Sequence, residues 1–241
     1  VFCALFGVNF SLFYFMLLGD FKSVRKNVEL RTYILMIAGA TALITANIHS
    51  MFPTIGKAFR YAVFQVVTII TTTGYATTDF AKWPMFSRAI IMMLTVVGAC
   101  ASSTGGGIKV SRLLVGIKCV KREIVQLAHP KSVGIIQIGG KKVSSDVLRT
   151  IYIYFIAYIG ILISSILLVS LDNFDFETTF SAVLTTFGNV GPGMAKVGPM
   201  GNFADFSPLS KLVLCFDMLA GRLEIFPFLV LFTAPAWRRK F

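Results

Sequence analysis

Charged side chains are scarce in this chain. Asp, Glu, Lys and Arg make up 14% of the 241 residues, whereas soluble domains carry about a quarter. Hydrophobic residues make up 56%, and the mean hydropathy is +0.77. This balance excludes an ordinary soluble domain and predicts a membrane protein.

The residues that most often carry catalysis or bind metal are also few. The two histidines, His49 and His129, lie far apart, which favours solvated or interfacial side chains over a zinc or catalytic site. The four cysteines are scattered and form no CxxC pair, so neither a disulfide framework nor a metal pair is indicated. The chain has no HExxH, no GxSxG and no pair of intramembrane carboxylates. We therefore expect no enzyme, and a membrane enzyme is the weaker alternative. The cysteines are Cys3, Cys100, Cys119 and Cys215.

Long apolar segments, in contrast, are abundant. Five of them approach the ~20 residues that a bilayer core requires, which predicts five spanning helices. Two further apolar runs, Phe59–Ile70 and Phe176–Phe187, hold about a dozen residues each, which is too short to cross and suits re-entrant or interfacial helices. The five long segments are Val1–Leu18, Tyr33–Ile48, Pro84–Ala101, Ile151–Leu171 and Leu212–Phe232.

Basic residues predict the orientation of the chain. Sixteen of the 23 fall in three segments, which we expect on the cytoplasmic side because Lys and Arg near span ends are retained there. The isoelectric point of 9.8 does not indicate nucleic-acid binding, because the charge lies beside spans without aromatic residues between the basic ones. The three segments hold Lys22, Arg25, Lys26 and Arg31; nine residues from Lys109 to Arg149; and Arg238, Arg239 and Lys240.

The chain contains an internal repeat. Residues Ala58–Ala76 align with Asp175–Gly193 without a gap, and Gly74 then stands opposite Gly191. Each copy reads as span, short helix, glycine loop and span, a pattern typical of transport folds. The Val1 start and the unmatched first span indicate a piece of a longer product. We predict a closing helix of a preceding repeat (1–20), a cytoplasmic linker (21–32), a pore repeat (33–114), a basic cytoplasmic segment (115–148) and a second pore repeat (149–241).

The two glycine loops, Thr71–Asp79 and Phe187–Gly193, have a physical interpretation. Irregular backbone at membrane depth is tolerated where it is buried in protein or lines a watery path. A short helix that points into the membrane directs the negative end of its dipole inward, where it favours a cation. Glycine lets successive carbonyl groups in such a loop point to one side. The alternative is a pair of ordinary helix C-caps.

Four motifs resemble the Trk/Ktr/HKT potassium transporters, and among them most closely the bacterial TrkH branch. The resemblance implies an all-α membrane protein with four tandem repeats of span, pore helix, filter loop and span, of which this chain holds the third and fourth. It also implies a multi-pass protein of the bacterial plasma (inner) membrane, in contact with lipid and usually a homodimer. The motifs are S-S-T-G-G-G-I-K-V-S-R at Ser102–Arg112, N-V-G-P-G-M at Asn189–Met194, G-R-L-E-I-F-P at Gly221–Pro227 and A-P-A-W-R-R-K at Ala234–Lys240.

The resemblance also implies a selectivity filter, with potassium as the transported ion. The first of the four filter loops is not in this sequence, so sodium conduction and a non-conducting subunit stay open, as does coupling to protons or sodium. Two copies of this chain pairing into one pore is a further alternative. The filter residues are Thr72, Thr73, Gly74 and Tyr75, with Asn189, Val190, Gly191 and Pro192; potassium would lie at Thr72, Thr73, Gly74, Asn189, Val190 and Gly191.

A second glycine-rich stretch, S-S-T-G-G-G at Ser102–Gly107, interrupts an apolar span. Three consecutive glycines cost about 1 kcal/mol each relative to alanine, so we expect the helix to break there. A merely kinked helix is the alternative, and a P-loop is excluded because Gly-Ile-Lys replaces Gly-Lys-Ser/Thr. The resemblance implies an intramembrane loop that gates the pore, with Gly105, Gly106 and Gly107 as its flexible part and Lys109 as its anchor.

Arg222 is a charge within the last apolar segment, where it must face protein or water. Neither Asp217 nor Glu224 has the spacing of a helical partner, so we expect its partner elsewhere or in a watery cavity. The resemblance implies an electrostatic barrier beneath the filter, and a structural ion pair is the alternative.

The basic segment 115–148 is either a solvated loop or a docking surface. The resemblance implies docking of a cytoplasmic Rossmann-type regulatory ring, similar to TrkA. This chain has no G-x-G-x-x-G, so we expect no cofactor of its own, and NAD or ATP/ADP would bind the partner. A tight turn is predicted at Gly139–Lys142.

Overall fold

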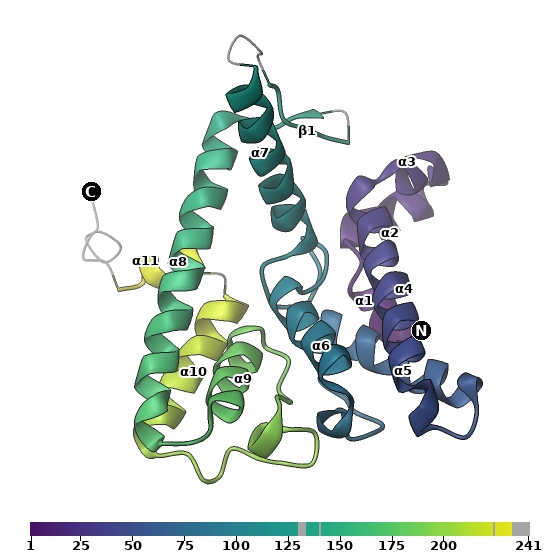
Figure 1. Cartoon of the computed structure of the whole chain (residues 1–241). Coiled ribbons are helices and arrows are strands. Elements are labelled where there is room, and N and C mark those ends of the chain that lie inside the picture. The colour runs from purple at the N-terminus through teal and green to yellow at the C-terminus, as the bar shows by residue number, and fades with distance from the viewer. Residues whose placement is uncertain (130–133, 140, 224, 233–241) are drawn as a thin grey trace.

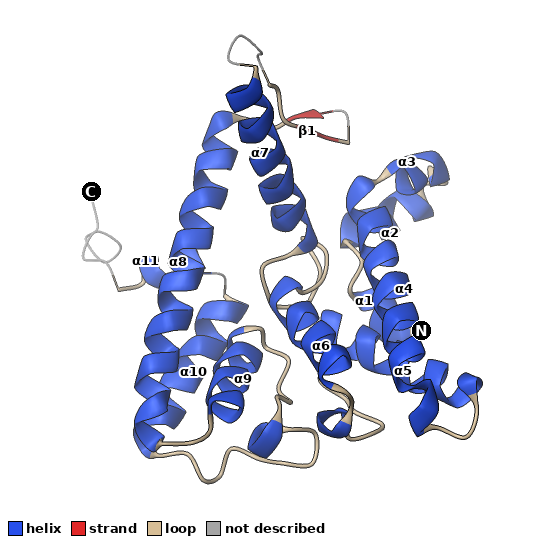
Figure 2. Ribbon diagram, in the orientation of Figure 1, coloured by secondary structure: helices blue, strands red, loops and turns tan. Residues whose placement is uncertain are grey.

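The computed structural model shows a mostly helical chain (Figures 1 and 2). It describes residues 1–241 except 130–133, 140, 224 and 233–241. Several predicted features lie outside the described residues: Lys131, Glu224, the basic residues Arg238–Lys240 and the motif Ala234–Lys240.

The amino-terminal apolar segment is not one continuous helix, so the prediction of a single span over Val1–Leu18 is wrong. It forms α1 (Phe2–Phe6) and α2 (Phe10–Leu17). Asn9 starts the second helix, because its side chain accepts a hydrogen bond from the backbone N–H of Ser11 at 2.9 Å. The basic helix α3 (Phe21–Lys26) follows.

The next part of the chain packs three helices together. The long helix α4 (Val28–Ile48) and the short turn η1 (His49–Met51) lead into α5 (Ile55–Ile70). After the first glycine loop, η2 (Phe80–Lys82) precedes α6 (Met85–Val97). The largest hydrophobic cluster of the described residues lies among these helices, with Ile44, Ile69 and Ile91 almost fully buried.

The predicted break at the glycine-rich stretch is confirmed. Helix α6 ends at Val97, and α7 (Val110–Ala128) begins after a loop of residues 98–109, here called the glycine-rich loop. Two short strands, β1 (Gln137–Ile138) and β2 (Lys141–Lys142), pair antiparallel at the predicted turn, so the fold is not strictly all-α. The basic helices α3 and α7 extend toward the same end of the molecule (Figure 1).

The last part repeats the order of a long helix, a short helix, a loop and another helix. The elements are α8 (Ser145–Val169), η3 (Ser170–Asp172), α9 (Phe176–Phe187), η4 (Ala195–Val197), α10 (Pro208–Arg222) and α11 (Ile225–Val230). The predicted continuous span Leu212–Phe232 is wrong, because α10 ends at Arg222. Pro227 explains the interruption: its ring would clash with the carbonyl group four residues earlier in a continuous helix.

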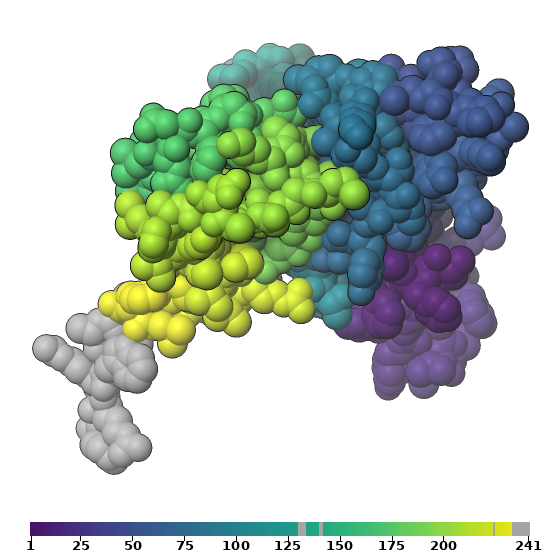
Figure 3. Space-filling model, turned by 90° about the horizontal axis from the view of Figure 1, so that it is seen from below, coloured from purple at the N-terminus to yellow at the C-terminus, as the bar shows by residue number. Residues whose placement is uncertain are grey.

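Two described stretches are long and apolar enough to cross a membrane, Val28–Met51 and Ser145–Asp172. Large apolar side chains on α8 are exposed, with Ile156 at 72% and Ile163 at 52%, as expected for a surface that faces lipid. Helix α6 is apolar but has 13 residues, so the predicted span Pro84–Ala101 is shortened by the glycine-rich loop. When the molecule is seen from below, the segment from α4 to α6 and the segment from α8 to α10 lie side by side (Figure 3).

Candidate functional site

The two glycine loops, which follow α5 and α9, touch each other. Gly74 faces the second loop so closely that an added Cβ would lie 2.1 Å from the carbonyl oxygen of Val190 and 3.3 Å from Cδ of Pro192. Its φ of +79° is a second reason for glycine, because L-residues rarely adopt this conformation. The predicted residues of both loops are thus brought together at one place.

The two loops also have the same backbone geometry. In each loop, one backbone N–H donates to the carbonyl oxygen of the residue three positions earlier. The next N–H donates to the carbonyl oxygen of the residue five positions before it. The residues opposite each other in the ungapped repeat have matching φ values: 54° at Thr72 and 56° at Asn189, and 79° at Gly74 and 104° at Gly191. The four bonds are Thr72 to Ile69 at 3.0 Å, Asn189 to Thr186 at 3.0 Å, Thr73 to Thr68 at 2.8 Å and Val190 to Thr185 at 2.9 Å.

Both loops lie at the carboxyl ends of short helices. Helix α9 matches the predicted bounds and is buried along most of its length, and α5 begins at Ile55, four residues before the predicted start. Their amino ends are capped by Thr54 and Asp175. The dipole of each helix directs negative potential toward its glycine loop. The described residues contain no group of three His, Cys, Asp or Glu side chains fit for a metal ion, so a cation here would rely on carbonyl and hydroxyl oxygens.

The predicted filter residues differ in exposure. Val190 is buried, whereas Gly191 and Tyr75 are exposed, Tyr75 to 69%. The hydroxyl groups of Thr71 and Thr73 lie 2.8 Å apart and bond each other. Thr73 is thereby tied to the end of α5, since the Thr71 hydroxyl also bonds the carbonyl of Val67 at 2.6 Å.

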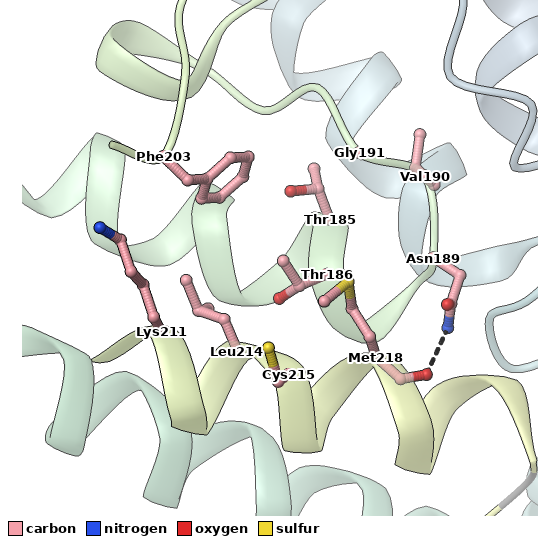
Figure 4. Close-up of a pocket in the computed structure, with 10 residues that line it drawn as sticks. All are labelled: Thr185, Thr186, Asn189, Val190, Gly191, Phe203, Lys211, Leu214, Cys215 and Met218. Carbon is pink, nitrogen blue, oxygen red and sulfur yellow. Dashed lines mark hydrogen bonds between the residues drawn. The ribbon is translucent and has the colours of Figure 1, made fainter. Parts of the chain in front are cut away.

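A cavity of about 500 Å³ lies beside the second loop, between it and α10 (Figure 4). The Asn189 side chain donates from Nδ2 to the carbonyl oxygen of Met218 at 3.1 Å, which ties this loop to α10. Sequence reasoning did not single out the α10 residues that line the cavity. Their spacing, which places them on one face of a helix, is the signal in the sequence that could have identified them. These residues are Lys211, Leu214, Cys215 and Met218.

The glycine-rich loop packs against both glycine loops. The backbone N–H of Gly106 donates to the hydroxyl of Thr72 at 3.0 Å. An added Cβ on Gly106 would lie 2.4 Å from the carbonyl oxygen of Gly188, and one on Gly105 would lie 3.1 Å from Cβ of Ala99. These two glycines therefore serve close approach, whereas Gly107, with φ +76°, serves backbone conformation.

Lys109 and Arg222 both contact this loop. Lys109 is 8% exposed, and its ammonium group donates to the carbonyl oxygen of Gly105. Arg222, the last residue of α10, donates to the carbonyl oxygen of Thr104. The partner of Arg222 thus lies outside its own helix, as expected, and it is a backbone carbonyl.

The amino-terminal helices also reach the glycine-rich loop, which sequence reasoning missed. The carboxylate of Glu29 accepts a hydrogen bond from the N–H of Ala101 at 2.6 Å. The N–H of Cys100 donates to the carbonyl of Gly7 at 3.1 Å, and that of Phe10 donates to the carbonyl of Ser102 at 3.2 Å. No periodicity or motif marks these positions, so the sequence held no signal for them.

Comparisons with known proteins identify relatives along the whole chain. The profile of the TrkH family, described as a cation transport protein, matches residues 4–238. The Trk system potassium uptake protein TrkH of Salmonella typhimurium is 34% identical over 241 residues, 99% of this chain and 50% of that protein. The protein of the same name from Escherichia coli K12 is 35% identical with the same coverage. The chain therefore spans about half the length of the curated relatives it matches.

A solved structure shows the same fold. The crystal structure of the potassium transporter TrkH from Vibrio parahaemolyticus matches with a TM-score of 0.90 and 34% sequence identity. The match covers 98% of this chain and 51% of that one.

Proposed function

The chain belongs to the TrkH family of cation transport proteins, and we propose that it supplies the third and fourth pore repeats of a potassium uptake protein. The observation that carries the proposal is the contact between two glycine loops of matching backbone geometry at the carboxyl ends of short helices. Two relatives that share about a third of its residues are potassium uptake proteins by name.

The loops would act as half of a selectivity filter. Carbonyl groups of Thr72, Thr73 and Gly74, and of Asn189, Val190 and Gly191, replace water around a dehydrated potassium ion, and Tyr75 and Pro192 flank them. The helix dipoles of α5 and α9 favour the cation at this point. Positive φ at Gly74 and Gly191 supports this assignment, because it lets neighbouring carbonyl groups point to one side.

The glycine-rich loop would be the gate. It lies against both filter loops, and the cationic groups of Lys109 and Arg222 meet its carbonyl oxygens. A positive charge beneath the filter repels potassium, so the loop with Arg222 forms both a steric and an electrostatic barrier. Opening requires Gly105 and Gly106 to move away from Thr72, with the backbone turning at Gly107.

The complete protein would work in the bacterial plasma membrane as a homodimer. The basic segment that includes α7 extends away from the filter (Figure 1) and supplies the docking surface for a TrkA-like regulatory ring that binds NAD or ATP/ADP. The chain itself would carry no cofactor.

The test is rubidium uptake by the complete protein in cells that lack their own potassium uptake. We expect Gly191→Asp to abolish uptake, because φ there is +104° and a carboxylate would enter the ion path. Gly160→Ala is the matched control: Gly160 lies in α8 with no atom within 4 Å of an added Cβ, so uptake should stay unchanged. Surface biotinylation checks that each protein reaches the membrane.

Three outcomes separate the alternatives. Uptake lost in Gly191→Asp alone supports the filter. Uptake that sodium inhibits as strongly as potassium supports a sodium-conducting protein. No uptake by the unaltered protein, even with the regulator present, contradicts the proposal and favours a non-conducting subunit.

A further inference from the structure

The glycine-rich loop has two limbs that are held differently. Residues 99–102, the first limb, bond the amino-terminal helices through Gly7, Phe10 and Glu29. Residues 104–106, the second limb, bond the Thr72 hydroxyl and the Arg222 guanidinium group. The first limb is thus tied to α1, α2 and α4, and the second limb is tied to the residues proposed to filter and gate.

Two glycines with positive φ bracket these limbs. Gly98 has φ +69° and Gly107 has φ +76°, and an added Cβ on Gly107 would lie 3.0 Å from Cα of Gly98. The backbone closes this base with hydrogen bonds from Ile108 to Val96 at 3.1 Å and from Lys109 to Val97 at 2.9 Å. These contacts hold the two ends of the loop together, so movement of the loop depends on the contacts that hold each limb.

Glu29 is a charged side chain that bonds the first limb. It lies in the first turn of α4, two residues after the Asn27 cap, whose side chain accepts a hydrogen bond from the N–H of Leu30 at 2.9 Å. The residue is 8% exposed, and burying a carboxylate is costly unless hydrogen bonds compensate it. The amino end of α4 and the N–H of Ala101 both favour the negative charge.

We propose that Glu29 is a positioning residue that anchors the first limb of the glycine-rich loop, so that movement is confined to the second limb. The effect of this anchor on ion transport rests on the proposed function, since a loop without the anchor would no longer close the pore fully. The anchor itself is a separate claim, because it concerns the conformation of residues 99–102 whether or not the loop gates an ion.

Cys100 offers a native reporter for the anchor. It precedes the bonded residue Ala101 and is fully buried. Cys119, on α7, is 2% exposed in a separate cluster with Val115 and Leu148, and it reports the fold away from the loop. The probe is N-ethylmaleimide on the purified complete protein, with the labelling rate of each cysteine read from its own peptide by mass spectrometry.

We expect Glu29→Ala to raise the labelling rate of Cys100 at least tenfold and to leave that of Cys119 unchanged. Glu29→Gln should stay within about threefold of the unaltered protein, because its amide oxygen can still accept from Ala101. The exposed carboxylate variant Asp205→Ala is the control and should change neither rate. Equal increases at Cys100 and Cys119 would show a general loss of stability, and no increase at Cys100 would show that Glu29 anchors nothing; either result overturns the proposal.

Rubidium uptake without the regulator then separates this inference from the gating proposal. Higher unregulated uptake in Glu29→Ala, with selective Cys100 labelling, supports both. Selective labelling with unchanged uptake supports the anchor and contradicts the gate. Unchanged labelling contradicts the anchor and leaves the gate to the Arg222 and Thr72 contacts.

Discussion

Thr72 is the residue at which the first glycine loop and the glycine-rich loop meet. It has φ 54°, which is strained for a β-branched side chain and costs about 1–3 kcal/mol. Its hydroxyl accepts the N–H of Gly106 at 3.0 Å. Asparagine adopts positive φ more readily than threonine, and Asn189 stands at the equivalent position of the other loop. The bond to Gly106 explains why threonine occupies this position instead.

We expect Thr72→Val to raise rubidium uptake in the absence of the regulator. Valine keeps the shape and the backbone strain but leaves the Gly106 N–H unpaired, which costs the closed loop about 1–3 kcal/mol. A loss of 1.4 kcal/mol corresponds to a tenfold shift between closed and open loop. Thr72→Ser retains the acceptor and should stay near the unaltered protein. Equal uptake in the two variants would show that the hydroxyl does not hold the loop.

At the residue scale the sequence predicted some features of the site and missed others. Gly74 and Gly191 were identifiable because two ungapped copies placed glycine after a short apolar run. The role of Glu29 was not, because its partner Ala101 is 72 residues away and is bound through a backbone N–H that any residue provides. Contacts of this kind depend on the packed fold and leave no pattern in the chain.

At the scale of elements, composition predicted where helices form better than where they stop. The bounds of α9 were predicted correctly, since Asp175 precedes the apolar run and Gly188 ends it. The apolar segments Val1–Leu18 and Leu212–Phe232 gave the wrong result because each looks continuous in hydropathy. Asn9 and Pro227 interrupt them locally, and these signals are weak beside many apolar residues.

Helix α9 provides a test at this scale, because its amino-terminal cap holds the helix that carries the second loop. Hydrogen bonds from the Thr178 hydroxyl and then from its backbone N–H hold the pKa of the Asp175 carboxyl below its usual value. The ionised cap therefore stabilises the fold above the usual pKa of about 3.9, and this stabilisation is lost as the pH falls through the lowered value.

We expect Asp175→Ala to destabilise the protein by about 0.5–2 kcal/mol at pH 7. Asp175→Asn should cost less, because asparagine caps as well, and should remove this part of the acid sensitivity. Melting temperatures of the complete protein in detergent at pH 7 and pH 2 check both statements, because the lower pH lies below the usual pKa of the carboxyl group. Asp205→Asn is the control. An Asp175→Asn protein that loses as much stability between the two pH values as the unaltered one would contradict the assignment.

At the scale of the whole molecule, the segments before and after the glycine-rich loop are joined by contacts between distant parts of the chain. Besides the touching glycine loops, an ion pair joins α6 to α9: Arg88 donates to a carboxylate oxygen of Glu177 at 2.6 Å. The side chains are 23% and 43% exposed, so screening by solvent reduces the strength of the pair. We expect the pair to align the two segments, because α6 leads into the glycine-rich loop and α9 leads into the second glycine loop.

Exchanging the two charges tests this alignment. Arg88→Glu alone places two carboxylates together, and Glu177→Arg alone places two guanidinium groups together, so each should lower the melting temperature and rubidium uptake. The double variant restores opposite charges and should recover at least half of each loss, with a coupling energy of about 1 kcal/mol. The pair Lys82 and Asp79, at 3.4 Å within one segment, is the matched control and should show coupling near zero, because it joins no separate elements. Additive losses in the Arg88 and Glu177 double variant would show that the ion pair does not align the two segments, and the touching glycine loops would then have to hold them in register alone.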